Sequence, residues 1–576
     1  MTCSTFKQRH IALVTSCVAA FALSAHAAGP TVDAGSLLRQ SEQDLKLKNQ
    51  PFVLPSPKAA PSPTAQQAGE ATVQVRSFKF VGNKLLSSEQ LNNALASFSN
   101  RALTLQQLRQ VADAVIAIYR EAGWTVQAYL PRQEIDSGVV TIEIVEASFG
   151  GASVQGTQPQ RIAASRLVEM AEANLRKGQA LHANDLDRTL LILDDLPGVS
   201  VAGNLVEGQR DGETNLALIA TDDALVNGNS TLDNQGSRAT GIERVSVNLN
   251  LNSPARVGDL LATSLMHTQG IDYMRASYTL PVGNQGWRAG LHASSLKYKV
   301  LTSYDANATG TRGTADTAGF EASYPLLRSQ LSNAQLTWNY DDKTLENYIG
   351  NTLNSNYKIK AHSLGINSNR IDSWGNGGAT TASATVTQGR VLNEGSANAQ
   401  QDADGARVAG TYSKLNLSLS RLQSINAELS FYAAVSAQMA SKNLDSSERM
   451  YLGGATGVRA FPSSEAGGAT GRTVTLELRQ RLDYAFTLTG FYDYGHVGVN
   501  KHNANAASGT PISNLNAYAL QGYGASLAWQ DAKGLELKAI LAKRSAANPA
   551  ADSTTGFDGD KTKKTTRVWV SAGMAF

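Results

Sequence analysis

The side chains that most often carry out covalent chemistry or bind metals are few in this sequence and form no known pattern. Both cysteines, Cys3 and Cys17, precede residue 28. No histidine stands in a nucleophile or metal-binding motif; after residue 27 the histidines are His182, His267, His292, His362, His496 and His502. The sequence also lacks a phosphate-binding Gly-Lys-Ser/Thr loop. We therefore expect a protein that is not an enzyme and that uses neither a cofactor nor a metal.

The first residues have the composition of a secretory signal peptide. Lys7 and Arg9 supply a positively charged start, residues 11–23 an apolar stretch, and Ala25-His26-Ala27 a small-residue cleavage site. We expect cleavage after Ala27, which would assign residues 1–27 to the signal and leave the mature chain without a thiol.

Composition and charge exclude several classes of protein. The chain has 576 residues, of which 42% are hydrophobic and 17% charged, as in ordered proteins. Its 51 basic and 48 acidic residues give a net charge of +3 without a long basic run, so no nucleic-acid partner is indicated. After residue 28 no apolar stretch reaches the length of about 18 residues that a membrane helix needs. A membrane role would therefore require a β-barrel.

Residues 227–576 contain many short segments in which apolar and polar side chains alternate. The clearest apolar positions are Val245, Val247, Leu249, Leu251, Leu415, Leu417, Leu419, Val474, Leu476 and Leu478. A soluble β-sandwich shows such alternation too. The number of segments, the small and charged residues on the polar faces, and aromatic residues near segment ends favour a transmembrane antiparallel β-barrel. A barrel of about 16 strands fits the length, and about 14 or about 18 strands would fit as well.

The last ten residues end the chain as an alternating segment with an aromatic terminus. Its apolar face carries Val568, Val570, Ala572, Met574 and Phe576. This ending is similar to the assembly signal of bacterial outer-membrane barrels. We therefore expect Phe576 to be read by the barrel-assembly machinery during biogenesis, and the barrel to contact outer-membrane lipid.

Residues 72–226 combine strands and helices in the order β-α-α-β-β, twice. In the first unit, residues 72–147, we predict strands at 73–80, 125–129 and 139–145 and helices at 87–98 and from Thr104 to before Gly123. In the second unit, residues 148–226, we predict strands at 153–155, 199–205 and 215–221 and helices at 160–174 and 185–193. The repeat is one of architecture, and the whole chain is predicted to be of mixed fold class.

Two further segments precede these units. Residues 51–71 contain Pro51, Pro55, Pro57, Pro61 and Pro63 and are predicted to form an extended linker. Within residues 28–50, the segment 36–46 is compatible with a short helix that could plug the barrel, and equally with an unstructured tail.

Several motifs, taken in order, resemble one family over nearly the whole mature chain. They are Gly123-Trp124 with Ala128-Tyr129-Leu130-Pro131, then Asp195-Leu196-Pro197-Gly198-Val199, then Asp233-Asn234-Gln235-Gly236-Ser237-Arg238, and finally the segment Leu452 to Pro462. The chain resembles the two-partner secretion transporters, the hemolysin activator and filamentous hemagglutinin transporter family. The resemblance implies two POTRA domains, at 72–147 and 148–226, followed by the barrel.

The resemblance also implies a loop, around residues 452–472, that folds back into the barrel lumen. Its tip, Val458-Arg459-Ala460-Phe461, departs from the family pattern by Ala and Phe in place of Gly and Tyr. Asp493 points inward by strand alternation and resembles the acid that anchors this loop. Since a planar guanidinium binds a carboxylate through two hydrogen bonds, we expect Arg459 to pair with Asp493, and we keep Glu477 as a second partner. Alternatively, these are ordinary solvated lumenal charges.

The function that the resemblance implies is passive export of another protein. The partner would be a secreted exoprotein, adhesin-like or hemolysin-like, recognised in the periplasm through its N-terminal secretion domain. It would cross the outer membrane unfolded and fold outside. A barrel-assembly insertase and a gated porin of the same superfamily remain the alternative functions.

The first α+β unit offers a candidate capture site for that partner. In such a unit the third strand usually lies between the other two, so residues 125–129 should form a free sheet edge. Free edges accept extended chains through backbone hydrogen bonds. Trp124, Val126, Ala128 and Tyr129 are the residues that we expect at this site. Core packing remains the alternative for the apolar residues nearby.

Overall fold

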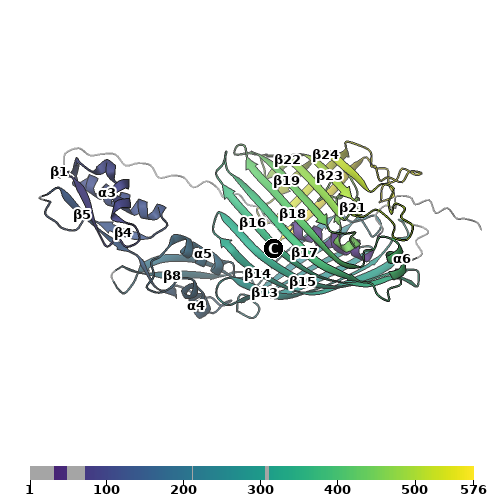
Figure 1. The fold of residues 1–576 in the computed structure, drawn as a ribbon, viewed down its shortest axis with the longest axis horizontal. Helices are drawn as coiled ribbons and strands as arrows, with labels where there is room; N and C mark the ends of the chain where they lie inside the picture. The colour runs from purple at the N-terminus through teal and green to yellow at the C-terminus, as the bar shows by residue number, and fades with distance from the viewer. Residues whose placement is uncertain (1–31, 49–71, 136, 211, 305–309) are drawn as a thin grey trace, which may run out of the picture.

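The computed structural model describes residues 32–48, 72–135, 137–210, 212–304 and 310–576. Two small α+β units follow one another in a row and lead into a large barrel (Figure 1). The predicted signal peptide and proline-rich linker lie outside the described residues. In the described part of the chain, no helix is long and apolar enough to cross a membrane.

The first α+β unit packs its helices against one face of a three-stranded sheet of order β2-β5-β4. Its elements are β1 Thr72–Val75, β2 Ser77–Val81, α2 Ser88–Ala94, η1 Ala96–Phe98, β3 Arg101–Thr104, α3 Leu105–Glu121, β4 Val126–Tyr129 and β5 Val139–Glu146. The Thr104 side chain accepts a hydrogen bond from the Gln107 backbone, and Gln107 reaches back, so the predicted capping box is confirmed. The predicted sheet order, with the third strand in the middle, is confirmed as well.

The prediction of one continuous strand over residues 73–80 was wrong. The strand is interrupted at Arg76, whose backbone N–H donates to the Gly138 carbonyl at 2.6 Å. The first piece, β1, leaves the main sheet and pairs with β3 in a sheet of two strands. A strand of four residues such as β3 is stabilised mainly by its partner, so its own sequence did not predict it.

The second α+β unit repeats the arrangement, with sheet order β6-β8-β7. Its elements are β6 Ser148–Val154, α4 Ala164–Asn174, α5 Ala183–Asp194, β7 Val199–Glu207 and β8 Glu213–Asp222. This unit also contacts the barrel. The Arg328 guanidinium donates to both Asp195 carboxylate oxygens, at 2.7 and 2.8 Å, and Arg188 donates to the Pro325 carbonyl at 2.7 Å.

The rest of the chain forms a closed antiparallel barrel of 16 strands within the described residues. The strands are β9 Val226–Asp233, β10 Arg244–Asn252, β11 Leu260–Thr268, β12 Ile271–Val282, β13 Trp287–Lys299, β14 Arg312–Arg328, β15 Ser332–Ile349, β16 Thr352–Asp372, β17 Gly378–Leu392, β18 Gly410–Ser424, β19 Leu429–Ala440, β22 Thr470–Arg481, β23 Phe486–Gly498, β24 Ala517–Gln530, β25 Leu535–Arg544 and β26 Thr566–Ala575. A short helix, α6 Ala399–Asp404, lies between β17 and β18. The apolar faces point outward, where Leu291 and Leu419 are more than half exposed.

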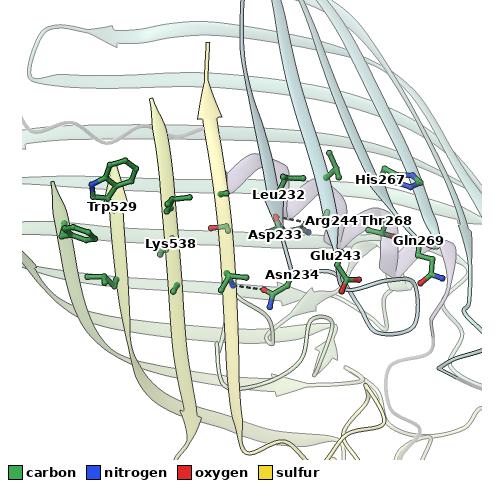
Figure 2. A pocket seen from close by; sticks show the side chains of 18 residues that line it. Leu232, Asp233, Asn234, Glu243, Arg244, His267, Thr268, Gln269, Trp529 and Lys538 are labelled. Carbon is green, nitrogen blue, oxygen red and sulfur yellow. Dashed lines mark hydrogen bonds and ion pairs between the residues drawn. The ribbon is translucent and has the colours of Figure 1, made fainter. Parts of the chain in front are cut away.

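The barrel closes where its last strand, β26, meets its first, β9. Five residue pairs join these strands, from Ser571↔Asp233 to Ala575↔Asn229, and at one end Gly228 and Phe576 exchange two further backbone hydrogen bonds. At the other end the Asn234 side chain continues the pairing, since its Nδ2 donates to the Val568 carbonyl at 3.1 Å. Its Oδ1 accepts from the Val570 N–H at 2.8 Å (Figure 2).

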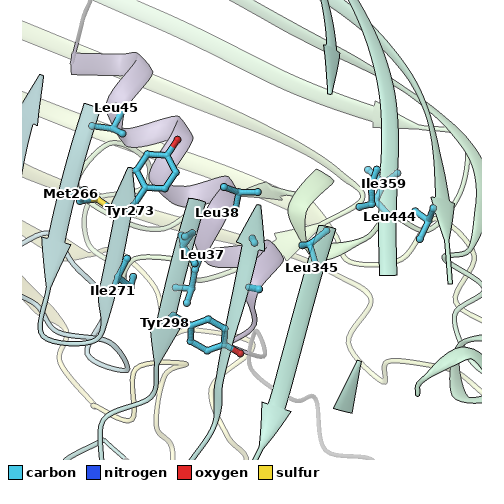
Figure 3. Packing of buried hydrophobic residues seen from close by; sticks show 14 of the residues in the cluster. Leu37, Leu38, Leu45, Met266, Ile271, Tyr273, Tyr298, Leu345, Ile359 and Leu444 are labelled. Carbon is cyan, nitrogen blue, oxygen red and sulfur yellow. The ribbon is translucent and has the colours of Figure 1, made fainter. Parts of the chain in front are cut away.

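A helix from the N-terminal segment, α1 Ala34–Lys48, lies inside the barrel (Figure 3). Its buried side chains Leu37, Leu38 and Leu45 pack against inward residues of the wall, among them Met266, Tyr273, Leu296, Tyr298 and Leu345. Of the two alternatives kept for residues 36–46, the structure shows the helix. Its apolar stripe packs against the inward side chains of the barrel wall.

Candidate functional site

The lumen is occupied by a long loop, residues 441–469, that connects β19 to β22. The loop contains a 3₁₀ turn, η2 Ser446–Glu448, and two short paired strands, β20 Met450–Tyr451 and β21 Gly467–Gly468. It therefore starts before the predicted residue 452 and ends before the predicted residue 472. The turn at its tip carries Arg459 into the barrel interior, where the side chain is 7% exposed.

The Arg459 guanidinium meets two carboxylates from adjacent strands. Its Nε donates to Asp493 Oδ2 at 2.8 Å and its Nη2 to Asp493 Oδ1 at 2.7 Å, which is the bidentate geometry. Its Nη1 donates to Glu477 Oε1 at 2.8 Å. The structure thus brings together all three charged residues that the sequence singled out. They are nearly fully buried, so they do not behave as ordinary solvated charges.

Strand alternation places the two carboxylates on the lumenal side. Asp493 lies on β23 and Glu477 on β22, and the residues directly beside them in these strands, among them Leu476 and Tyr492, face outward. Neighbouring side chains hold each acid in place: Thr475 Oγ1 donates to Asp493 Oδ1 at 3.2 Å, and Arg479 Nε donates to Glu477 Oε2 at 2.8 Å. The acids are therefore oriented by the barrel wall as well as by Arg459.

The rest of the loop tip packs closely against the wall. Val458 and Phe461 are fully buried. The Phe491 ring lies under the Arg459 guanidinium, 3.5 Å from ring centroid to Cζ, and Trp569 Nε1 donates to the Arg459 carbonyl at 2.8 Å. The Phe461 ring faces the Arg544 guanidinium, with 4.4 Å between the ring centroid and Cζ.

Two glycines of the wall make this close approach possible. A Cβ added at Gly495 would lie 2.9 Å from Val458 Cγ2, and one added at Gly522 would lie 2.5 Å from Ala460 Cβ. Distances below 3.0 Å cannot be accommodated without movement of the tip or the wall. The loop tip therefore fits a wall that lacks side chains at these two places.

Residues that the sequence analysis did not single out hold α1 in the lumen. Arg244 pairs with Asp44 of α1, and its Nε donates to Asp233 Oδ1 at 3.0 Å (Figure 2). Gln40 of α1 accepts a hydrogen bond from Ser464 of the loop. Arg244 could have been found as an inward charge, because it alternates with the outward Val245. Its partner in α1 lies too far away in the sequence for any local pattern to indicate it.

The four residues of the candidate capture edge differ in their surroundings. Val126 is buried in the core of the first unit, Ala128 is half-buried, and Tyr129 is 45% exposed. The Trp124 indole packs edge-on against the imidazole of His182 in the second unit, with 4.7 Å between ring centroids. Of these four residues, Ala128 and Tyr129 therefore offer side-chain surface on β4, and Trp124 belongs to the joint between the units.

The backbone of β4 shows which of its amides face the open edge. The Ala147 N–H donates to the Thr125 carbonyl at 3.0 Å, so that carbonyl points toward β5. In a trans peptide the N–H of the next residue points the opposite way. The Val126 N–H therefore faces away from β5, and strand alternation repeats this orientation at Ala128.

A buried hydrogen bond ties helix α3 to the far end of this sheet. The Tyr119 hydroxyl donates to Glu146 Oε1 at 3.0 Å. Burial and this bond to a carboxylate raise the pKa of Tyr119 above its usual range. The tyrosine therefore remains a neutral donor.

Among the described residues, no group of three or more His, Cys, Asp or Glu side chains is arranged to hold a metal ion.

The fold and the lumenal site together define a class of protein: an outer-membrane β-barrel transporter with N-terminal α+β domains. The family model of the haemolysin secretion/activation protein ShlB/FhaC/HecB matches residues 212–521, and that of the ShlB-type POTRA domain matches residues 73–147. The first match covers more than half of the chain, so the chain belongs to the ShlB/FhaC/HecB family. It is a two-partner secretion transporter of the outer membrane, and the family consists of transporters rather than enzymes.

Curated relatives and solved structures agree with this assignment. The chain is 25% identical over 530 residues to the heme/hemopexin transporter protein HuxB of Haemophilus influenzae strain 86-028NP, covering 89% of this chain and 91% of that protein. It is 24% identical over 451 residues to the outer membrane transporter CdiB of Dickeya dadantii strain 3937, covering 75% and 78%. The fold is similar to that of CdiB from Escherichia coli, with a TM-score of 0.67 and 20% identity over 95% of this chain and 99% of that one.

Proposed function

We propose that the first POTRA domain captures a secreted exoprotein, adhesin-like or hemolysin-like, by accepting part of its N-terminal secretion domain at the β4 edge. The barrel then passes the unfolded chain to the cell surface. Among relatives, one is described as a heme/hemopexin transporter protein and another as an outer membrane transporter. These names support an exported partner for this chain without identifying it.

The observation that carries the proposed passage through the barrel is that the lumen is occupied. Both α1 and the loop 441–469 occupy the barrel interior and are held to its wall by buried ion pairs. A chain can cross only when they move. We therefore propose that Val458, Arg459 and Phe461, with Glu477 and Asp493, form a lock for the loop tip, and that α1 is a plug.

Partner-dependent secretion tests this function. We expect a secreted exoprotein partner, produced in the same cells, to reach the medium only when those cells also produce this chain. The amount of an unrelated outer-membrane barrel in the membrane should stay the same in both strains. If cells that lack this chain also lose the unrelated barrel from the membrane, the result would support an insertase. If they export the partner as well as cells that produce this chain, a gated porin would be the remaining function.

The insertase alternative has one structural observation in its favour. The fold is similar to that of BamA from Haemophilus ducreyi lacking POTRA domains 1-3, with a TM-score of 0.53 at 13% identity. This similarity concerns the barrel architecture. The match of the family model to residues 212–521 favours secretion.

A further inference from the structure

A second buried ion cluster holds the base of the lumenal loop, away from Arg459. Glu448, the last residue of η2, is 3% exposed. Its Oε1 accepts from Lys343 Nζ at 2.9 Å and its Oε2 from Lys414 Nζ at 2.6 Å. Its backbone carbonyl accepts from Lys414 Nζ and from Gln438 Nε2, both at 3.1 Å. The loop base is thus bound through a side chain and a carbonyl of the same residue.

The partners of Glu448 come from separate parts of the wall. Lys343 lies on β15 and Lys414 on β18, and β16 and β17 stand between them in the barrel. Both ammonium groups are nearly fully buried. Charges taken out of water need a partner, and removal of one member of such a group leaves an uncompensated buried charge. Among the described residues, Glu448 is the carboxylate that forms hydrogen bonds with both lysines.

The same turn is packed directly against the plug helix. Ser446 Oγ donates to Asp33 Oδ1 at 2.8 Å. A Cβ added at Gly35 of α1 would lie 2.9 Å from the Ser447 backbone N, so α1 approaches the turn as closely as a glycine allows. Arg39 Nε of α1 donates to the Arg449 carbonyl at 3.4 Å. Movement of η2 therefore moves the surface on which the N-terminal end of α1 rests.

From these contacts we propose that Glu448 is a positioning residue for transport: it is a second anchor of the loop, independent of Arg459, and it keeps α1 seated in the closed lumen. The inference rests on the proposed role of the loop and α1 in closing the channel. Arg459 anchors the tip of the loop to β22 and β23, and Glu448 anchors its base to β15 and β18. Release of either anchor loosens the loop, and release of Glu448 also loosens the plug.

Channel recordings of the full-length protein in planar lipid bilayers test the proposal. Glu448→Gln keeps the shape of the side chain but removes its charge, and we expect at least about a tenfold increase in the open fraction, because two buried lysines lose the negative charge that compensates them. Asp342→Asn is the matched control, since Asp342 is next to Lys343 and forms an exposed pair with Lys360 at 3.5 Å. Deletion of residues 32–48 gives the reference for an unplugged barrel. Heat-modifiable migration on gels shows that each barrel has folded.

The outcomes separate the anchor from the proposed function. If Arg459→Ala opens the channel and Glu448→Gln behaves like Asp342→Asn, the anchor role is overturned while the loop lock stands. If neither variant nor the deletion of residues 32–48 changes conductance, the proposal that the loop and α1 close the channel is rejected, and the anchor role of Glu448 is rejected with it. If Glu448→Gln does not fold, Lys414→Gln is the deciding variant, because it leaves Glu448 paired with Lys343, a pair without net charge. A smaller increase in the open fraction would support the anchor role of Glu448. No increase would reject it.

Discussion

Arg459 shares one of its two acidic partners with the partly exposed Arg479, so the cluster at the loop tip holds two positive and two negative charges. Glu477 accepts from both arginines, whereas Asp493 accepts from Arg459 through both oxygens and from the Thr475 hydroxyl. Such a balanced cluster tolerates burial because each charge is compensated. Its sensitivity to substitution is correspondingly high.

Arg459→Ala is expected to release the loop tip and to lower secretion of the partner about tenfold or more. The change leaves Asp493 without its bidentate partner, and breaking a buried pair costs about 3–5 kcal/mol. Secretion into the medium is the measurement, with the folded barrel checked by heat-modifiable migration. Arg459→Lys keeps the charge but not the planar guanidinium, so its secretion should lie between that of the unchanged protein and that of Arg459→Ala. Normal secretion by both Arg459→Ala and Asp493→Ala would show that this cluster is not a lock.

Gly522→Ala should have a similar effect through shape alone. The added methyl group would meet the Ala460 Cβ at 2.5 Å and force the loop tip away from β24. Gly490→Ala on β23 is the control, because its added Cβ would meet no described heavy atom within 4 Å. Adding Ala460→Gly to Gly522→Ala should restore part of the lost secretion. Equal secretion by the two glycine variants would contradict this account of the fit.

At the scale of elements, strand β4 combines a paired side with an open one. The joint with the second unit already uses the residues just before it, where the Thr125 N–H donates to the Leu181 carbonyl at 3.3 Å. An added strand therefore has the amides of Val126 and Ala128 to bind, and the exposed Tyr129 ring beside them. This is a short edge, which suits weak and sequence-tolerant capture of an unfolded chain.

Ala128→Pro should abolish that capture while leaving the domain folded. Proline removes the outward N–H and obstructs the edge, and the pairing of β4 with β5 does not use this amide. Val126→Pro is a less clean test, because it also removes a buried side chain. The measurement is binding of the partner's N-terminal region to the full-length transporter in detergent. Ala128→Ser, which keeps the N–H, is the control, and undiminished binding by a folded proline variant would exclude β4.

At the scale of the whole molecule, the barrel is continuous with a periplasmic arm. The second POTRA domain is tied to the end of β14 by the pair of Asp195 and Arg328 and by the hydrogen bond from Arg188 to the Pro325 carbonyl. The pair is partly exposed, so each bond contributes little by itself and the domain is held by several contacts together.

The topology predicts a specific pattern of protease resistance. In outer-membrane preparations opened to the periplasm, a protease should digest the POTRA domains and leave a protected fragment from about residue 227 to Phe576. A closed barrel has no free strand edges and keeps its backbone hydrogen bonds inside the membrane, so it resists cleavage. Unboiled samples should migrate differently from boiled ones. Complete digestion, or recovery of the chain in the soluble fraction, would contradict the membrane assignment.

Much of the architecture was predictable because its cause is local. Alternation with a period of two tells which side chains face lipid and which face the lumen, so the barrel, the inward position of Asp493 and the outward face of residues 567–576 follow from short stretches of sequence. The caps and stripes of the POTRA helices are local in the same way. For the loop tip, the resemblance to a family supplied what no single stretch contains.

The tertiary structure decided which distant residues meet. Arg459 and Asp493 are 34 positions apart, Lys343 and Glu448 are 105 apart, and Asp44 and Arg244 are 200 apart. The amphipathic segment of α1 was compatible with a helix or a tail, because its apolar stripe needs a partner and nothing nearby in the sequence provides one. Closure of the barrel creates that partner, a wall of inward side chains drawn from many strands. Alternation can place a charge on the lumenal side, but only the closed barrel determines which opposite charge lies across from it.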